Sequence, residues 1–254
     1  MTMTLLRTLA LSGALAAILG AAACQTAPPT ASSAYITAAV ADAARPQADK
    51  DRDADRKPAE MIAFAETHPG EKIGELIPGG GYMTRLFSKA VGPKGHVYLF
   101  SGPPRQGQTA QPFQPILDDT ANYGNTSFIL TDFKTLAAPE KVDLVWTSQN
   151  YHDIHNPGRN IDINVANKAV YDALKPGGLY VVLDHQSAKG QDFDANLHRI
   201  DMQRVKTEVL AVGFEFVAES KVLNNPADDG TKSVFDPSIR GKTNQFILKF
   251  RKPG

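Results

Sequence analysis

Cysteine is almost absent from this 254-residue chain, and its one cysteine, Cys24, excludes an intrachain disulfide and a cysteine-rich metal site. Net charge is absent as well, because 27 Lys and Arg balance 27 Asp and Glu. No overall field draws such a chain to nucleic acid or to an anionic membrane surface, so we expect a small-molecule partner and no nucleic acid. The hydrophobic residues, 42% of the chain, can fill the core of one large α/β domain.

The N-terminal apolar run, Thr8 to Ala23, is too short and too soon followed by polar residues to predict a membrane-spanning helix. Arg7 before it and the alanines before Cys24 are typical of an export signal. Its end resembles a bacterial lipobox, although Ala21 stands where such boxes usually carry leucine. We expect residues 1–24 to be a signal segment and the protein to be exported to the periplasm. Cys24 would then carry a lipid anchor; the alternatives are plain cleavage and an uncleaved anchor.

The next segment, residues 25–57, predicts a linker and a charged lead-in. Its first part is Ala, Pro, Ser and Thr with few large apolar side chains, and Asp49 to Lys57 alternates both signs. An amphipathic helix follows from Pro58, with apolar residues at helical spacing. We therefore expect one domain over residues 58–254.

Strand-like and helix-like segments alternate along that domain. We expect strands at residues 72–77, 96–100, 127–131, 142–147, 179–183, 214–223 and 245–250, and helices at 82–91, 113–121, 161–174 and 201–212. Parallel neighbouring strands need helical crossovers, so this alternation predicts a doubly wound, seven-stranded, mostly parallel α/β sheet.

A glycine-rich turn follows the first expected strand: Pro78, Gly79, Gly80 and Gly81. Ligands of open α/β sheets bind beyond the carboxyl ends of the strands, where the strand order reverses. Glycines there let the backbone approach a ligand closely, and the helix that follows aims free amides at it. The alternative is a tight turn that packs against nothing but protein.

Two stretches carry a resemblance to a known family. The stretch from Glu75 to Arg85, Glu-Leu-Ile-Pro-Gly-Gly-Gly-Tyr-Met-Thr-Arg, resembles motif I of the class I S-adenosylmethionine (SAM)-dependent methyltransferases. Leu174-Lys-Pro-Gly-Gly178 resembles the turn before their fifth strand. The stretches Asn150–Asp153 and Asn225–Asp229 resemble an exported bacterial branch of predicted methyltransferases.

The resemblance covers roughly residues 58–252 and implies a Rossmann-like fold whose last strand is antiparallel. It also implies SAM as the cofactor. The residues it assigns to cofactor binding are Glu75, Pro78, Gly79, Gly80, Gly81, Ser101, Asp132 and Asn150. Two of the matching positions depart from the family pattern: Ile77 replaces a glycine, and Ser101 replaces the acid that binds the ribose hydroxyls. For Asp132, a loop-capping role is the alternative to contact with the adenine.

The loop after the fourth expected strand predicts the acceptor site. It reads Ser-Gln-Asn-Tyr-His-Asp-Ile-His-Asn over residues 148–156 and is dense in titratable groups. His152 or His155 can act as a general base near neutral pH, with Asp153 orienting it. The alternative for each histidine is a structural role that holds the loop.

Asp184 and His185 end the fifth expected strand on the same rim, so a metal site with His152 and His155 is a further alternative. We prefer the general base and predict no metal. The Asp-rich loop from Asn225 to Arg240 either closes over the site or forms a surface hairpin.

We therefore expect a SAM-dependent methyltransferase that acts on a small molecule or an envelope component. The alternatives are an exported methyltransferase-like binding protein without turnover, and a metal-dependent hydrolase.

Overall fold

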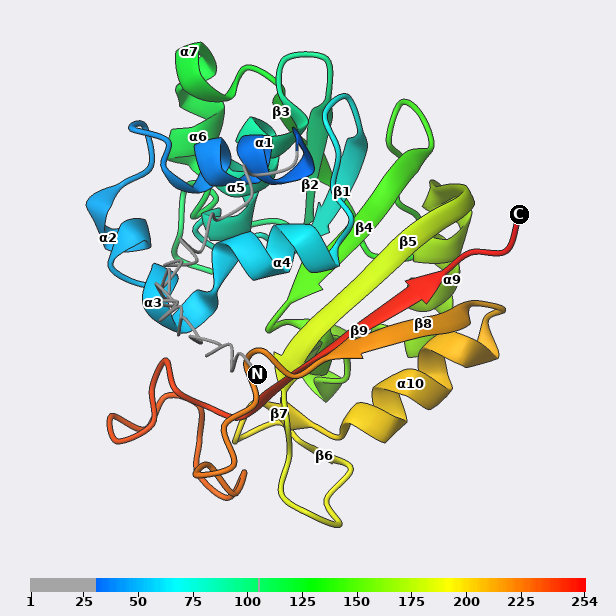
Figure 1. The fold of residues 1–254 in the computed structure, drawn as a ribbon. Helices are drawn as coiled ribbons and strands as arrows, with labels where there is room; N and C mark the ends of the chain where they lie inside the picture. The colour runs from blue at the N-terminus through cyan, green and yellow to red at the C-terminus, as the bar shows by residue number, and fades with distance from the viewer. Residues whose placement is uncertain (1–30, 105) are drawn as a thin grey trace, which may run out of the picture.

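The computed structural model describes residues 31–104 and 106–254. Its main sheet has seven strands in the order β3-β2-β1-β4-β5-β9-β8 (Figure 1). These strands are β1 (Lys72–Leu76), β2 (His96–Ser101), β3 (Thr126–Leu130), β4 (Val142–Ser148), β5 (Leu174–His185), β8 (Glu215–Ser220) and β9 (Gln245–Arg251). Neighbours from β3 to β5 run parallel, whereas β9 is antiparallel to both β5 and β8. The predicted mostly parallel sheet with an antiparallel last strand is confirmed.

Helices join the strands as the alternation predicts. They are α1 (Ala31–Val40), α2 (Gln47–Lys50), α3 (Asp53–Arg56), α4 (Pro58–Phe64), α5 (Tyr82–Val91), α6 (Gln114–Asp118), α7 (Thr120–Tyr123), α8 (Tyr151–Ile154), the 3₁₀ turn η1 (Pro157–Arg159), α9 (Ile163–Ala173) and α10 (Met202–Ala211). Asp162 and Asp201 cap α9 and α10, each accepting two backbone N–H bonds. The helix expected at 113–121 is instead α6 and α7, because Asp119 leaves the helical conformation and caps the second. A small ribbon of β6 (Phe193–Asp194) and β7 (Arg199–Ile200) precedes α10.

Each face of the sheet is buried under its own helices, as the two sides of Figure 1 show. Alternate residues of β4 divide between the faces: Leu144 and Trp146 pack with α1, α4 and α5, whereas Val145 packs with α9 and α10. Because strands buried on both faces are apolar at every position, they read as continuous hydrophobic runs. Because helices cover both faces, the edge where the strands end is the part of the sheet that a ligand can reach.

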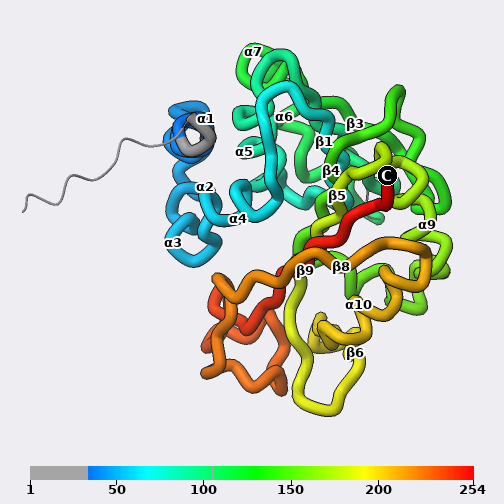
Figure 2. The backbone as a smooth tube through the Cα atoms, turned by 45° about the vertical axis from the view of Figure 1, so that its right-hand side comes forward, coloured from blue at the N-terminus to red at the C-terminus, as the bar shows by residue number. Residues whose placement is uncertain are grey.

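The structure differs from the linker expected over residues 25–57. Residues 31–56 form α1, α2 and α3, which lie as a row along one side of the domain (Figure 2). Ile36 and Ala39 of α1 are buried in the core shared with α5. Arg45 has a fully buried side chain that donates to both carboxylate oxygens of Asp53, at 2.8 and 2.6 Å. Small residues permit close packing of helices. The low content of large apolar residues in this segment therefore did not indicate an unfolded tether.

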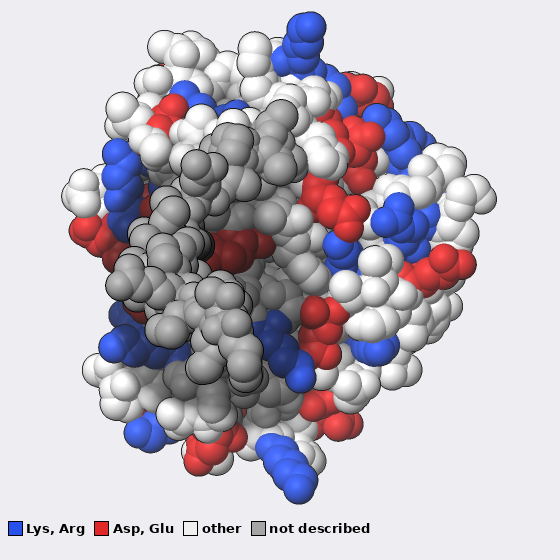
Figure 3. Space-filling model, viewed as in Figure 1, with Lys and Arg blue, Asp and Glu red and all other residues white. Residues whose placement is uncertain are grey.

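The predicted signal segment and Cys24 lie outside the described residues. Within the described ranges, no helix combines the length and the apolarity that crossing a bilayer requires. On the face seen in Figure 3, positive and negative side chains are interspersed.

Candidate functional site

The carboxyl ends of β1 and β4 lie side by side at the centre of the sheet, where the strand order reverses. From β1 the chain continues to β2 and β3 on one side, and from β4 to β5 on the other. The glycine turn follows β1 and α8 follows β4, so the topology brings the two predicted parts of the site together. Three hollows open along this rim.

Two glycines of the turn face open space. A Cβ added at Gly79 or at Gly80 would meet nothing within 4 Å, and both residues line the hollows on either side of the turn. Gly81 is different, because a Cβ there would lie 2.0 Å from Ile116 Cδ1 of α6. Gly79 and Gly80 therefore leave room for a ligand, whereas Gly81, also predicted to bind cofactor, is needed for packing.

Ile77 adopts the left-handed backbone conformation, with φ of 50°. A β-branched residue is strained there by about 1–2 kcal/mol, which explains why glycine is the usual residue at the matching family position. The Ile77 carbonyl accepts a hydrogen bond of 2.9 Å from Asn150 Nδ2. Asn150, predicted to bind cofactor, thus ties the β1 turn to the β4 loop and lines the first hollow.

The first hollow has a volume of about 240 Å³ and lies between the glycine turn and the N-terminal helices. It is lined by Asp49, Arg52, Arg56, Glu75, Leu76, Ile77, Pro78, Gly79, Gly80, Tyr82, Met83, Ser148, Gln149 and Asn150. Glu75 is buried and accepts a 2.5 Å hydrogen bond from Thr84 Oγ1. Burial raises the pKa of its carboxyl to about 8. Ser148 Oγ is buried without a hydrogen-bond partner among the described residues.

Sequence reasoning missed the cationic wall of this hollow. Arg56 donates a 2.9 Å hydrogen bond to Gln149 Oε1, and its guanidinium lies 4.6 Å from the centre of the Tyr82 ring. Burial, and next the charge of Arg52, lowers the pKa of Arg56 to about 10. The signal in the sequence was the pair Arg52 and Arg56 within the charged stretch 49–57, which we interpreted as a charged lead-in to the domain.

The second hollow, about 300 Å³, lies on the other side of the glycine turn. Ser101 lines it together with Gln111, whose Nε2 donates 2.7 Å to the Gly102 carbonyl. Asp132 does not reach any of the three hollows. Its side chain is exposed and accepts a 3.0 Å hydrogen bond from the Lys134 amide, so Asp132 has the loop-capping role that was the alternative.

The third hollow, about 550 Å³, shares Gln149 and Asn150 with the first and Arg159 with the second. Its lining is Gln149, Asn150, His152, Asp153, Asn156, Arg159, His185, His198, Val234 and Phe235. Val234 and Phe235 come from the loop between β8 and β9, which therefore forms one wall of this hollow.

His152 is held by Asp184 and not, as predicted, by Asp153. Its Nδ1 lies 2.7 Å from Asp184 Oδ1, and its amide donates 2.8 Å to Asp184 Oδ2. Burial alone lowers the pKa of His152, but the Asp184 carboxylate outweighs it, and the net pKa lies above the ordinary value. His152 Nε2 lies 3.2 Å from Nδ1 of His198. His198 was missed, because it lies 46 residues from His152 in the sequence, outside the loops that carry the predicted site residues.

His155 turns away from the hollow. Its Nε2 lies 2.9 Å from Glu208 Oε2, a carboxylate that also accepts from Tyr151 Oη and from Arg204 Nε. His155 therefore links the end of α8 to α10, as its structural alternative requires, and does not line the third hollow. The neighbouring His185 is buried, with Nδ1 2.8 Å from Thr243 Oγ1, and burial lowers its pKa to about 3.

A buried ion pair holds the wall formed by the β8–β9 loop. Arg199 NH2 lies 2.9 Å from Asp228 Oδ2, and both side chains are almost completely buried. Arg199 also donates 2.8 Å hydrogen bonds to the carbonyls of Gln186 and Lys232. The loop is thus fixed to β7 rather than projecting as a surface hairpin.

The first two hollows fit an elongated ligand with a charged end. Arg52 and Arg56 suit a carboxylate, and the Glu75 carboxyl suits an ammonium group. Gly79 and Gly80 provide a cradle that any side chain would fill. Ser101 offers one hydroxyl on the other side of the turn, where the resemblance leads one to expect a carboxylate.

Known proteins that resemble this chain include methyltransferases. No protein-family model matches the chain. The chain is 28% identical over 139 residues to the ubiquinone/menaquinone biosynthesis C-methyltransferase UbiE of Hydrogenovibrio crunogenus. The match covers 52% of this chain and 51% of that protein, so the chain matches about half the length of this relative.

Two solved structures share the fold. A SAM-dependent methyltransferase from Aquifex aeolicus matches with a TM-score of 0.55 at 12% identity, over 76% of this chain and 87% of that one. The [4+2]-cyclase SpnF matches with a TM-score of 0.56 at 17% identity, over 79% and 81%. At these identities the likeness concerns the fold, and the reaction has to be argued from the site.

Proposed function

We propose that this chain, whose fold is that of the class I SAM-dependent methyltransferases, transfers a methyl group from SAM to a small-molecule acceptor. One observation carries the proposal: two hollows meet at the open glycines Gly79 and Gly80, and Gln149 and Asn150 connect the first of them to a third. A cofactor across the turn would thus lie beside an acceptor in the third hollow. Such alignment is most of what a methyl displacement needs from an enzyme.

The residues of the first two hollows would hold SAM by its charged and polar groups. Bound SAM supplies an electrophilic methyl group. Arg52 and Arg56 would pair with its carboxylate, and the carbonyl oxygen of the Glu75 carboxyl would accept a hydrogen bond from its ammonium group, while Gly79 and Gly80 allow close backbone approach. Ser101 would contact the ribose through one hydroxyl, which gives weaker binding than a carboxylate would.

His152 is the residue best placed to handle the acceptor's proton. When Nδ1–H is donated to Asp184, the lone pair of Nε2 faces the third hollow. In metal-free protein this nitrogen can take a proton from an acceptor hydroxyl or amine as the methyl group arrives. Asn150 ties the adjoining loop to the glycine turn through its hydrogen bond to the Ile77 carbonyl.

Calorimetric titration of the full chain with SAM, and with its demethylated product, tests cofactor binding. We expect saturable binding of both ligands at one site per chain. No heat and no thermal shift at millimolar ligand would contradict the proposal. Binding without turnover of any acceptor would instead favour the methyltransferase-like binding protein, to which Ile77 and Ser101 point.

Substitution of His152 tests the acceptor side. We expect His152→Ala to lower kcat by about 10²–10⁴-fold, the range for loss of a general base, and to leave SAM affinity unchanged. His68→Ala is the matched control, because His68 is exposed and lines none of the three hollows. Equal kcat in both variants would remove His152 from this role.

We also propose that the protein works outside the cytoplasm, anchored by a lipid on Cys24, and belongs to an exported branch of these methyltransferases. The support is the signal-like sequence of residues 1–24. Metabolic labelling with a lipid precursor should mark the wild type and not Cys24→Ala. Labelling of neither protein would contradict the anchor.

A further inference from the structure

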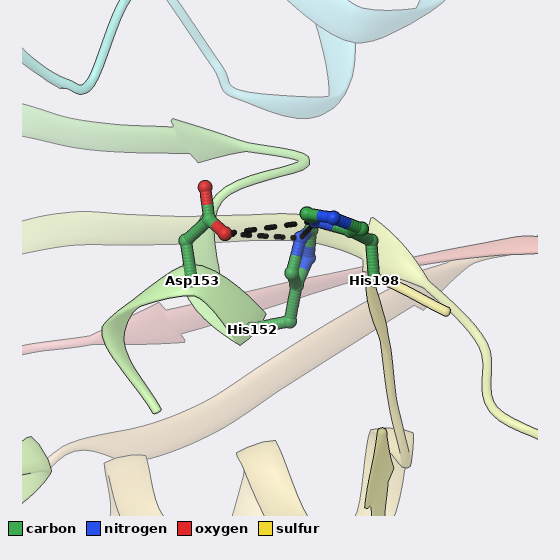
Figure 4. A group of neighbouring side chains, drawn as sticks. All are labelled: His152, Asp153 and His198. Carbon is green, nitrogen blue, oxygen red and sulfur yellow. Dashed lines mark hydrogen bonds and ion pairs between the residues drawn. The ribbon is translucent and has the colours of Figure 1, made fainter. Parts of the chain in front are cut away.

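Two histidines and one aspartate converge on a single point in the third hollow (Figure 4). His152 and Asp153 project from α8, and His198 from the segment before β7. His152 Nε2 and His198 Nδ1 are 3.2 Å apart. Asp153 Oδ1 is 3.6 Å from the first nitrogen and 3.7 Å from the second. The three atoms thus form a nearly equilateral triangle of one oxygen and two nitrogens.

The size of this triangle fits a four-coordinate metal ion. Zinc ligands about 2.0–2.1 Å from a tetrahedral ion lie about 3.4 Å from one another. Ligands at the same distance from an octahedral ion such as Mg²⁺ would be about 2.9 Å apart. The three observed separations, 3.2, 3.6 and 3.7 Å, lie around the tetrahedral value.

The surroundings of His152 hold its ring as a metal ligand requires. The Asp184 carboxylate binds Nδ1 at 2.7 Å, which fixes the tautomer and directs the Nε2 lone pair to the centre of the triangle. Metal-ligating histidines almost always have such a carboxylate or carbonyl partner on the other nitrogen. Asp184 is fully buried and does not itself reach the triangle.

His198 is also held in place. It has the left-handed backbone conformation, with φ of 57°, and its ring packs edge to face against Phe235 at 4.8 Å between ring centres. A non-glycine residue in this conformation is strained, and strained residues persist where the surrounding structure fixes them. Adjacent Arg199 is buried and bonded to Asp228, which anchors the segment that carries the ring.

The charges around the triangle favour a cation. Asp153 and Asp184 supply two carboxylates, and Arg159 NH2 lies 3.4 Å from Asp153 Oδ2, the oxygen that is not part of the triangle. Arg159 offsets the charge of one carboxylate, so with neutral imidazole ligands the other carboxylate is left to balance a bound cation.

We propose that His152, Asp153 and His198 bind a zinc-type divalent cation whose open coordination position faces the third hollow. Three protein ligands and an open position are the arrangement of sites where a metal contacts substrate. From the sequence we preferred a general base to a metal site, because His198 was not among the residues considered. The ligand set that we considered included His155 and His185, and those two side chains do not converge with His152.

The identity of the fourth ligand rests on the proposed function. If the third hollow takes the methyl acceptor, the cation would bind an oxygen of that acceptor, and acceptors with a hydroxyl or carboxylate group would be preferred. His152 Nε2 would then serve as a ligand instead of a base. Metal binding itself does not depend on methyl transfer.

Titration of metal-free protein without a histidine tag with Zn²⁺ tests the site. We expect about one Zn²⁺ per chain, and at least a tenfold loss of affinity in Asp153→Asn and in His198→Ala. Asp184→Asn, which leaves all three ligands in place, should weaken binding by about 10–100-fold. His68→Ala should bind as the wild type does. Thermal melting of each variant confirms that it is folded.

Cobalt gives a second readout that does not depend on activity. We expect Co²⁺ in the wild type to show the intense visible absorption of four-coordinate cobalt, and His198→Ala to lose it. Equal Zn²⁺ affinity in wild type and His198→Ala, or a weak six-coordinate cobalt spectrum in the wild type, would overturn the proposal. Zinc binding without SAM binding would overturn the methyltransferase proposal alone, and SAM binding without zinc binding the metal site alone.

Discussion

At the glycine turn, single atoms determine how closely a ligand can approach the backbone. Gly79 has positive φ, so any side chain there is strained, whereas Gly80 has no such restriction. Both open into hollows. Gly80 is therefore the position where a methyl group can be added to the site without straining the fold.

We expect Gly80→Ala to lower SAM affinity by about tenfold and to change the free energy of unfolding by less than about 0.5 kcal/mol. The reason is that the new Cβ would occupy ligand space and touch no protein atom. Calorimetric titration and urea unfolding measure the two quantities. Gly158→Ala, in η1, is the matched control. A variant that is destabilised yet binds SAM normally would mean that Gly80 serves the fold alone.

The raised pKa of Glu75 predicts how stability depends on pH. Its folded-state pKa of about 8 lies above the ordinary value of 4.5, because burial disfavours the charged form. The folded state thus binds the proton more tightly. This contribution is fully present below pH 4.5, and a few kcal/mol are lost as pH rises towards 8.

We expect Glu75→Gln to remove this loss, because glutamine keeps an acceptor for Thr84 and does not ionise. Urea unfolding at pH 5 and at pH 8 should show a smaller decrease in the variant than in the wild type. Glu60→Gln, at an exposed position of α4, serves as the control. Parallel pH profiles for wild type and Glu75→Gln would show that Glu75 is ionised in the folded protein.

At the scale of elements, α1 shows where sequence patterns were insufficient. The alternation of strands and helices predicted the sheet, because strands buried on both faces and capped helices leave strong local signals. Residues 31–40 are mostly alanine and small polar residues, and their helix depends on contact with α5. That contact is tertiary information, which composition does not carry.

Part of the candidate site could likewise be predicted from the sequence, and part could not. Gly79 and Gly80 were predictable, since a turn between strand and helix is local. The partner of His152 and the orientation of His155 were not, because Asp184 and Glu208 lie 32 and 53 residues away in the sequence. Only the folded chain decides which of two neighbouring histidines faces the hollow.

We expect Ile36→Ala to lower the free energy of unfolding by about 2 kcal/mol, because it removes buried methylenes between α1 and α5. Urea unfolding of the full chain measures the loss. Ala38→Gln, on the exposed side of α1, should change stability by less than about 0.5 kcal/mol. A negligible loss in Ile36→Ala would mean that α1 is detached in solution, as the linker prediction had it.

At the scale of the whole molecule, the site is assembled from distant parts of the chain. The first hollow combines residues 49–56 with the turns after β1 and β4, and the third adds residues 234 and 235. A ligand that contacts all these parts binds the folded state and not the unfolded chain, so it stabilises the entire fold.

We expect SAM at 100 times its Kd to stabilise the fold by about 2.7 kcal/mol and to raise Tm by about 5–10 °C. The N-terminal helices and the sheet should melt in one transition, because α1 and α4 share a core with α5. Differential scanning calorimetry with and without SAM measures both. Two separate transitions, with only one moved by SAM, would show that the N-terminal helices fold independently of the binding site.

The position of α1 limits how far the domain can stand from a membrane. With a linker over residues 25–57, an anchor at Cys24 would leave the domain free to range widely above the bilayer. The helix α1 begins at Ala31, however, so only seven residue steps separate the anchor from α1. Fully extended, seven steps reach about 25 Å, less than the thickness of a bilayer's hydrocarbon core. Under the anchoring proposal, the domain would sit almost on the lipid surface, and acceptors would have to come to it there.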